Sequence, residues 1–306
     1  MRCRWHGHFR REYISHRGGP LHDVTGITIL IPPCQSRSFF DRFPGFQVRI
    51  YASGQLPADP LVEIGTLVTR LTILMYHRVD ALPNDNPHPK NFVTPFRFRE
   101  QIEGMLSLGY TPVTFEEWMH YRVHRGKLPH LPFIVTFDDG YADFDRNAWP
   151  ILRTLRVPAT VFLVASKIGG TNDWEREGPR TALLDAVRIR ALEAEGVTFG
   201  GHGYAHVPLA HVSPNEARIE IEHCRAALVA LLSKPPEVFA YPYSNQNATV
   251  RRLTREAGFL CAVRGKGRLN ARWIDPFGLR RILMHEGVTV RVLRRMLMRL
   301  RWMTIG

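Results

Sequence analysis

The 306-residue sequence contains few of the features expected of secreted disulfide-rich or membrane-spanning proteins. Its four cysteines, Cys3, Cys34, Cys224 and Cys261, form no C-x-x-C pair, and a chain of this length does not depend on a disulfide framework. We therefore expect free thiols in a reducing compartment. No stretch reaches the ~18 apolar residues of a membrane span, and the basic N-terminus lacks the apolar core of a secretory signal. These absences predict a cytoplasmic protein.

Positive charge, by contrast, is present in excess. The formal net charge is +13, which favours anionic partners such as nucleic acid, acidic glycans or an anionic membrane surface. No nucleic-acid motif and no interleaved aromatic-basic stripe accompanies this charge, so we interpret it as an arginine-rich surface and expect no nucleic-acid partner. The hydrophobic content of 44% allows a sizeable core in a globular protein.

Residues 1–67 differ from the rest of the chain. They are rich in Arg, His, Gly and Pro and show no sustained period, which predicts a poorly ordered basic extension. A sharper hypothesis is that this segment is not part of the natural product, with an alternative start near Leu67 or Val68. Residues 68–306 would then form one large folded domain.

From Leu71 onward, short apolar runs alternate with helical patterns. The predicted strands are residues 71–76, 133–137, 159–164, 197–200, 238–241, 260–263 and 281–284. The predicted helices are residues 95–108, 115–124, 145–155, 181–195, 214–232, 248–257 and 289–302. Ser213 and Glu216 predict a capping box at the start of one helix. Strands that alternate with helices predict an α/β fold with a parallel sheet or barrel.

Polar residues cluster after the predicted strands, at the edge where parallel α/β folds build their sites. Asp138 and Asp139 follow one strand, and two adjacent carboxylates repel each other unless a cation separates their roles. His202 and His206 follow another strand, with a spacing that lets one ion reach both imidazoles. Each pattern alone is weak, because Asp-Asp-Gly also forms turns and a chain with 14 histidines contains such pairs by chance.

Taken in order, these segments resemble the motifs of a known family. Residues 136–141 (TFDDGY) resemble the first motif of the polysaccharide deacetylases, also called the NodB-homology domain or carbohydrate esterase family four. Residues 202–209 are similar to the second motif, and residues 240–243 to the third in its Tyr-Pro-Tyr form. Residues 74–79 (LMYHRV) and 158–163 are similar to segments of one exopolysaccharide-associated branch. The resemblance extends over residues 71–284.

This resemblance implies a deformed parallel (β/α)7–8 barrel and hydrolysis of an N-acetyl or related acyl group on a carbohydrate. By position, Asp139, His202 and His206 would hold a divalent metal. Zinc is the metal that we expect first, and other transition metals are the alternative. Asp138 would be the general base that deprotonates a metal-activated water. The backbone N–H of Tyr243 would help to stabilise the oxyanion.

Two histidines compete for the role of general acid, which must protonate the leaving amine. His285 ends a Leu-x-His sequence that resembles a late motif in many family members. His77 belongs to the Tyr-His opening of the related branch, where this histidine lies at the metal-side rim. The sequence leaves both assignments open.

The chain also departs from the family pattern. Ala240 occupies the position at which the third motif often has an arginine that orients the base, and the late Asp-Trp motif is not recognisable. Arg264, Arg280 and Arg281 are the candidates to replace that arginine. Trp174, in a glycine-rich loop, is a hypothetical border of the substrate site.

The substrate implied by the resemblance is an N-acetylated glycan or a lipid-linked oligosaccharide. Two other functions stay open: an inactive glycan-binding relative and a metal-dependent amidohydrolase that acts on a non-sugar amide. The apolar side of the last predicted helix is expected to close the barrel. A membrane-surface role for this basic helix is the less favoured alternative.

Overall fold

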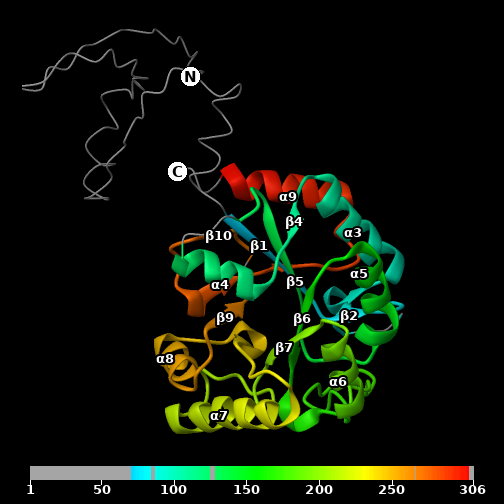
Figure 1. Ribbon diagram of the computed structural model, residues 1–306. Helices are drawn as coiled ribbons and strands as arrows, with labels where there is room; N and C mark the ends of the chain where they lie inside the picture. The colour runs from blue at the N-terminus through cyan, green and yellow to red at the C-terminus, as the bar shows by residue number, and fades with distance from the viewer. Residues whose placement is uncertain (1–69, 84–86, 125–127, 266, 303–306) are drawn as a thin grey trace, which may run out of the picture. The chain divides into compact units, whose positions relative to one another are not determined.

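The computed structural model describes residues 70–83, 87–124, 128–265 and 267–302, which form a strongly curved sheet surrounded by helices (Figure 1). The predicted extension of residues 1–67 lies outside the described residues. The strands are β1 (Arg70–Tyr76), β2 (Arg78–Val79), β3 (Phe92–Val93), β4 (Thr111–Pro112), β5 (Pro132–Phe137), β6 (Ala159–Leu163), β7 (Thr198–Gly201), β8 (Val238–Ala240), β9 (Cys261–Arg264), β10 (Asn270–Ala271), β11 (Leu279–Arg280) and β12 (Ile282–Leu283). The helices are α3 (Pro95–Ser107), α4 (Phe115–His124), α5 (Trp149–Leu155), α6 (Ala186–Ala194), α7 (Pro214–Leu231), α8 (Ala248–Glu256) and α9 (Val290–Trp302).

The sheet is mostly parallel and almost closes on itself. Its strand order is β10-β1-β5-β6-β7-β8-β9-β11, and β10 pairs antiparallel with β1. Strand β11 pairs with β9 near one end of the strand order, whereas β12 pairs with β1 near the other end. Arg281, the single residue between β11 and β12, therefore lies where the barrel closes, and its N–H donates to the carbonyl of Arg264 at 2.9 Å. The predicted deformed parallel barrel is confirmed.

Two layers of apolar side chains stabilise this barrel, because successive residues of a strand face opposite sides of the sheet. Leu71 and Ile73 of β1 belong to an interior cluster, which α4 completes with Phe115 and Trp118. Leu74 belongs instead to the larger cluster between the sheet and the outer helices. Since Leu71 lies at the start of its strand, α4 closes the amino end of the barrel and leaves the carboxyl end for the site.

The local signals place some helix boundaries and misplace others. The predicted capping box is confirmed, with reciprocal hydrogen bonds between Ser213 and Glu216 at the start of α7. The helix predicted over residues 181–195 is shorter, because Asp185 caps α6 by accepting from the backbone N–H of Arg188 at 2.8 Å. The residues ahead of Asp185 instead belong to a loop that borders the site. The strand predicted over residues 281–284 is likewise shorter, because only Ile282 and Leu283 form β12 and Arg281 lies at the barrel closure.

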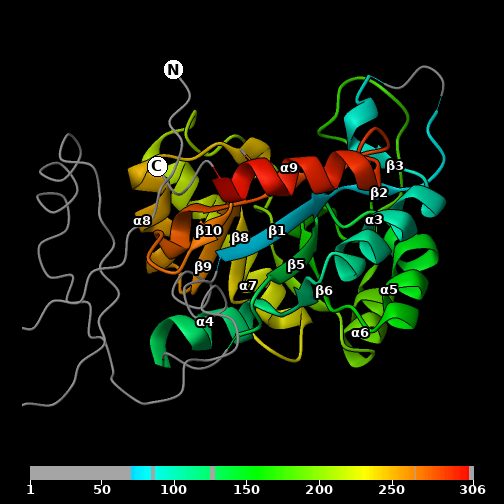
Figure 2. The ribbon, with the colours of Figure 1, turned by 90° about the horizontal axis from the view of Figure 1, so that it is seen from above.

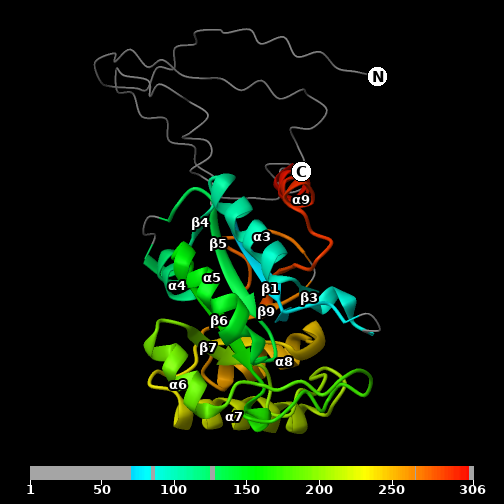
Figure 3. The same ribbon diagram turned by 90° about the vertical axis from the view of Figure 1, so that its right-hand side faces the viewer.

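Helix α9 runs along the outside of the barrel beside β1, as the view from above shows (Figure 2). The side view shows α3 as its neighbour (Figure 3). Leu293 and Leu297 are buried in the outer core, in agreement with the expected barrel-closing face. Arg291, Arg294, Arg295 and Arg299 are exposed. Within the described residues, no helix is both long and apolar enough to span a membrane.

Candidate active site

The polar residues that follow the strands meet at the carboxyl end of the barrel. Asp138 and Asp139 come directly after β5, His202 after β7, His77 after β1 and Tyr243 shortly after β8. All five line one cavity of about 340 Å³. Because the strands are parallel, segments separated by more than a hundred residues deliver their side chains to the same place. The predicted clustering of these residues is therefore present in the structure.

Asp139, His202 and His206 form a compact set of potential metal ligands. Oδ1 of Asp139 lies 3.3 Å from Nε2 of His202 and 3.3 Å from Nε2 of His206. The ligand atoms of the three residues lie within 4.8 Å of one another, and all three residues are buried. Nδ1 of His202 lies 2.8 Å from the carbonyl of Ala240, an arrangement that directs Nε2 toward the carboxylate. Two imidazoles and one carboxylate fit a catalytic divalent metal with open coordination positions.

The backbone of the site is held in left-handed conformations that non-glycine residues rarely adopt. The φ angles are 73° at Asp139, 61° at His206 and 56° at Tyr243. Gly140, with φ 77°, continues the turn after Asp139, and a Cβ there would approach Cδ2 of Leu163 to 2.8 Å. Such strain persists only where the surroundings over-determine it, and it concentrates at functional sites.

Burial and hydrogen bonding compete in setting the charge of the ligand set. Burial alone would raise the pKa of Asp139, but hydrogen bonds from His202 and His206 hold this pKa well below its usual value. Burial lowers the pKa of His206, which favours the neutral imidazole that a metal requires. Burial also acts to lower the pKa of His202, but Asp138 and Asp139 outweigh it and raise this pKa. The pocket thus concentrates negative charge where a cation would lie.

Asp138, the predicted base, forms a bidentate ion pair with Arg281. Nη1 and Nη2 of Arg281 donate to the two carboxylate oxygens at 2.6 and 2.7 Å, and only 1% of Arg281 is exposed. Nη1 also donates to Oγ1 of Thr136 at 3.2 Å. Burial acts to raise the pKa of Asp138, but the charge of Arg281, aided by His202 and His77, lowers it below the usual value. Of the three candidate arginines, Arg281 is therefore the one that pairs with Asp138, a contact that Ala240 cannot make.

The two candidate acids lie in different surroundings. Nε2 of His77 lies 4.0 Å from Oδ2 of Asp138, and His77 lines the cavity. His285 is not among the cavity-lining residues, and its Nδ1 accepts from the backbone N–H of Gly287 at 3.2 Å. Burial and the charge of Lys90 lower the pKa of His285. The structure thus brings His77, but not His285, next to the base.

Other cavity-lining residues carried little or no signal in the sequence. His88 and Asn91 come just before β3, with Asn91 at the end of a short 3-10 helix (Pro89–Asn91), and Glu175 and Arg176 follow Trp174 in the loop after β6. Among these residues Trp174 alone is a candidate from the sequence, as a tryptophan in an exposed loop. Neither segment has a hydrophobic period, so nothing in the sequence indicates that they fold toward the mouth of the barrel.

Comparisons with known proteins agree with this fold. Residues 126–262 match the family model described as polysaccharide deacetylase. The chain is 25% identical over 214 residues to a poly-beta-1,6-N-acetyl-D-glucosamine N-deacetylase of Staphylococcus aureus, an alignment that covers 65% of this chain and 73% of the relative.

Two solved structures share the fold. A Streptococcus pyogenes deacetylase, PplD, aligns with a TM-score of 0.66 and 21% identity, over 75% of this chain and 98% of the other. IcaB from Ammonifex degensii aligns with a TM-score of 0.64 and 24% identity, over 74% and 97% of the two chains. The family model matches residues 126–262 and the solved structures share the fold, so this part of the chain is a polysaccharide deacetylase domain.

Proposed function

We propose that the protein is a metal-dependent N-deacetylase that hydrolyses acetamido groups of a glycan. The observation that carries this proposal is the buried set of Asp139, His202 and His206 directly beside Asp138, at the floor of an open cavity. Zinc is the proposed metal, because two imidazoles and one carboxylate with open positions are a common catalytic zinc set. Its chemistry would be to polarise the acyl oxygen and to lower the pKa of water.

Asp138 is the proposed general base. Each carboxylate oxygen of Asp138 accepts one hydrogen bond from Arg281. An ionised carboxylate has further lone pairs, which can accept the proton of the attacking water. The ion pair also keeps Asp138 ionised and fixes its orientation. As the water oxygen bonds to the acyl carbon, its proton passes to Asp138, and the backbone N–H of Tyr243 is the proposed donor to the oxyanion.

His77 is the proposed general acid. It lines the cavity that holds the proposed metal set, and its Nε2 lies 4.0 Å from Oδ2 of Asp138. When the C–N bond breaks, the amine takes a proton from His77, and the products are acetate and a free amino sugar. His285 lies outside the cavity lining and would have to move to fill this role.

The proposed substrate is a polymer or oligomer of N-acetylglucosamine. The curated relative from Staphylococcus aureus is named for a poly-beta-1,6-N-acetyl-D-glucosamine substrate, and the proposed metal set lines a cavity of about 340 Å³. A lipid-linked form of the glycan, membrane association and a cytoplasmic location stay predictions from the sequence.

Acetate release from N-acetylglucosamine oligomers, with and without a chelator, tests the proposal. We expect release by the metal-loaded protein, loss of release after chelation and recovery when zinc returns. The Asp139→Asn variant is the matched negative control. Binding of the oligomers without acetate release would favour an inactive glycan-binding relative. Hydrolysis of simple amides without sugar turnover would favour a non-sugar amidohydrolase.

A further inference from the structure

The loop of residues 171–181 forms one wall of the cavity, with Trp174 at its inner side. The indole ring lies 4.7 Å from the ring of His206, tilted by 33°, and Trp174 is half-buried. Tyr243 packs edge-on against the same imidazole, with ring centroids 4.5 Å apart. Two aromatic side chains from distant segments therefore flank one ligand of the metal set and border the open cavity.

Trp174 does not contribute to the hydrophobic core. It belongs to neither cluster of apolar side chains in the described part of the chain, and the ring contact recorded for it is with His206. A large indole kept half-exposed beside a reactive site loses the stabilisation that full burial would give. Its position is therefore better explained by a ligand that covers the remaining face than by packing.

The wall is fixed from within by a buried amide. Asn172, 2% exposed, accepts from the backbone N–H of Thr181 at 2.6 Å and donates to Oε2 of Glu175 at 2.6 Å. The other carboxylate oxygen of Glu175 accepts from the hydroxyl of Tyr141 at 3.3 Å. Arg180 donates to the carbonyls of Asn172 and Glu175 at 3.0 and 2.7 Å. Asn172 and Glu175, one on each side of Trp174 along the loop, are thus held in place.

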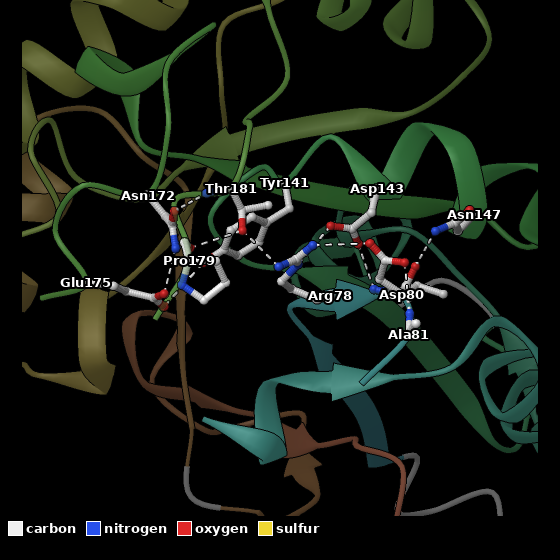
Figure 4. Close-up of polar contacts among 11 residues, drawn as sticks. Arg78, Asp80, Ala81, Tyr141, Asp143, Asn147, Asn172, Glu175, Pro179 and Thr181 are labelled. Carbon is white, nitrogen blue, oxygen red and sulfur yellow. Dashed lines mark hydrogen bonds and ion pairs between the residues drawn. The ribbon is translucent and has the colours of Figure 1, made fainter. Parts of the chain in front are cut away.

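Arg78 ties this wall to the barrel (Figure 4). Its Nη1 donates to Oγ1 of Thr181 at 3.0 Å, and its Nε donates to Oδ1 of the buried Asp143 at 3.0 Å. The guanidinium lies between the rings of Phe92 and Tyr141, 4.7 and 5.0 Å from their centroids. Arg78 comes two residues after β1 ends, and Tyr141 comes two residues after Asp139. The contacts of Arg78 therefore connect the loop of residues 171–181 to the strand ends that carry the proposed metal ligands.

We propose that Trp174 is the stacking platform for a pyranose ring of the glycan, and that Arg78, through Thr181, is a positioning residue for that platform. This inference rests on the proposed function. The apolar C–H face of a sugar can cover the free part of the indole. Because the loop is already ordered by its internal hydrogen bonds, little conformational entropy is lost when the sugar binds.

Kinetics of Trp174→Ala test the platform. For N-acetylglucosamine oligomers we expect KM to rise on the order of tenfold with kcat within about twofold, which is the signature of binding lost equally from the substrate complex and the transition state. Hydrolysis of p-nitrophenyl acetate, which has no sugar, should change by less than about twofold. Trp174→Phe should recover most of the affinity. Trp273→Ala is the matched control, because Trp273 is 73% exposed and does not line the cavity.

Thr181→Val tests the positioning role with a minimal change in volume. It removes the hydroxyl that accepts from Arg78, and we expect a smaller rise in KM in the same direction. In the Trp174→Ala background the substitution should add nothing, because the platform is already absent. Equal effects in both backgrounds would overturn the positioning role.

Two results would overturn the platform itself. One is an unchanged KM for the oligomers in Trp174→Ala; the other is loss of bound metal in proportion to lost activity, which would make Trp174 a support for His206 only. If the wild-type protein releases no acetate, the proposed function fails separately. Calorimetric binding of the oligomers to wild type and Trp174→Ala then still measures the platform.

Discussion

At the amino end of the barrel α4 closes the interior with apolar rings, whereas the carboxyl end buries charge on a left-handed backbone. Trp118 and Phe115 at the first end are almost fully buried. At the second end, Asp138 and Arg281 are buried as an ion pair, and Asp139 and His206 have positive φ angles. Burying paired charge adds little stability, and strained residues reduce it. The contrast indicates that one end stabilises the fold and the other is shaped for chemistry.

His202→Ala should have the largest effect on function. It removes one of the ligand atoms around Asp139 and leaves a buried carboxylate with one partner fewer. We expect kcat/KM for acetate release to fall by about a thousandfold or more, together with a loss of bound metal measured by elemental analysis. Retention of both metal and activity would remove His202 from the site.

Trp118→Ala should produce the opposite pattern at the other end of the barrel. Deleting a fully buried indole leaves a large cavity in the interior cluster, so we expect a cost of about 3–5 kcal/mol in the free energy of unfolding. The activity per folded molecule should stay within about twofold of wild type. Urea unfolding and kcat on the same samples measure the two quantities. A large loss of kcat in the folded protein would show that the two ends are not separable.

Arg281→Met should affect mainly the chemistry and its pH dependence. Asp138 must be ionised to accept a proton, so activity is lost as the pH falls through its pKa. Arg281 is the largest stabilising influence on the ionised form, and its removal raises that pKa. We expect kcat/KM to fall on the order of a hundredfold. In the plot of kcat/KM against pH, the acid limb should move to higher pH. Arg280→Met is the matched control, since Arg280 makes no side-chain contact with Asp138; an unmoved limb would argue against the pairing.

His77→Ala should have the smallest of these effects. Loss of a general acid in the cavity should lower kcat by at least about tenfold. The matched His285→Ala variant should stay within about twofold, because His285 does not line the cavity. The reverse order of the two effects would transfer the acid role to His285, and two small effects would exclude both histidines.

The alternation of strands and helices predicts a parallel sheet or barrel, and the resemblance of the motifs to a known family is what specifies the deformed barrel. Hydrophobic runs and capping residues are local properties, and parallel strands bring the residues after them to one edge. This placement predicts that Asp138, Asp139, His202 and His206 lie at one edge, and the family resemblance is what assigns them to one metal site.

The partners that come from irregular segments could not be placed in this way. Arg281 was one of three candidate arginines, and only the closure between β11 and β12 distinguishes it from Arg264 and Arg280. The contact of Trp174 with His206 depends on the hydrogen bonds of a loop without hydrophobic periodicity. Long-range contacts of this kind are set by tertiary structure, which a linear pattern does not encode.

Titration of the metal-free protein with zinc, with acetate release from N-acetylglucosamine oligomers as the readout, tests the central claim most directly. We predict that activity is absent without metal, rises in proportion to bound zinc and saturates at about one ion per chain, as a single ligand set of this kind requires. The His202→Ala variant should show no such saturation. Full activity in the metal-free protein, or saturation that is the same in His202→Ala, would contradict the account.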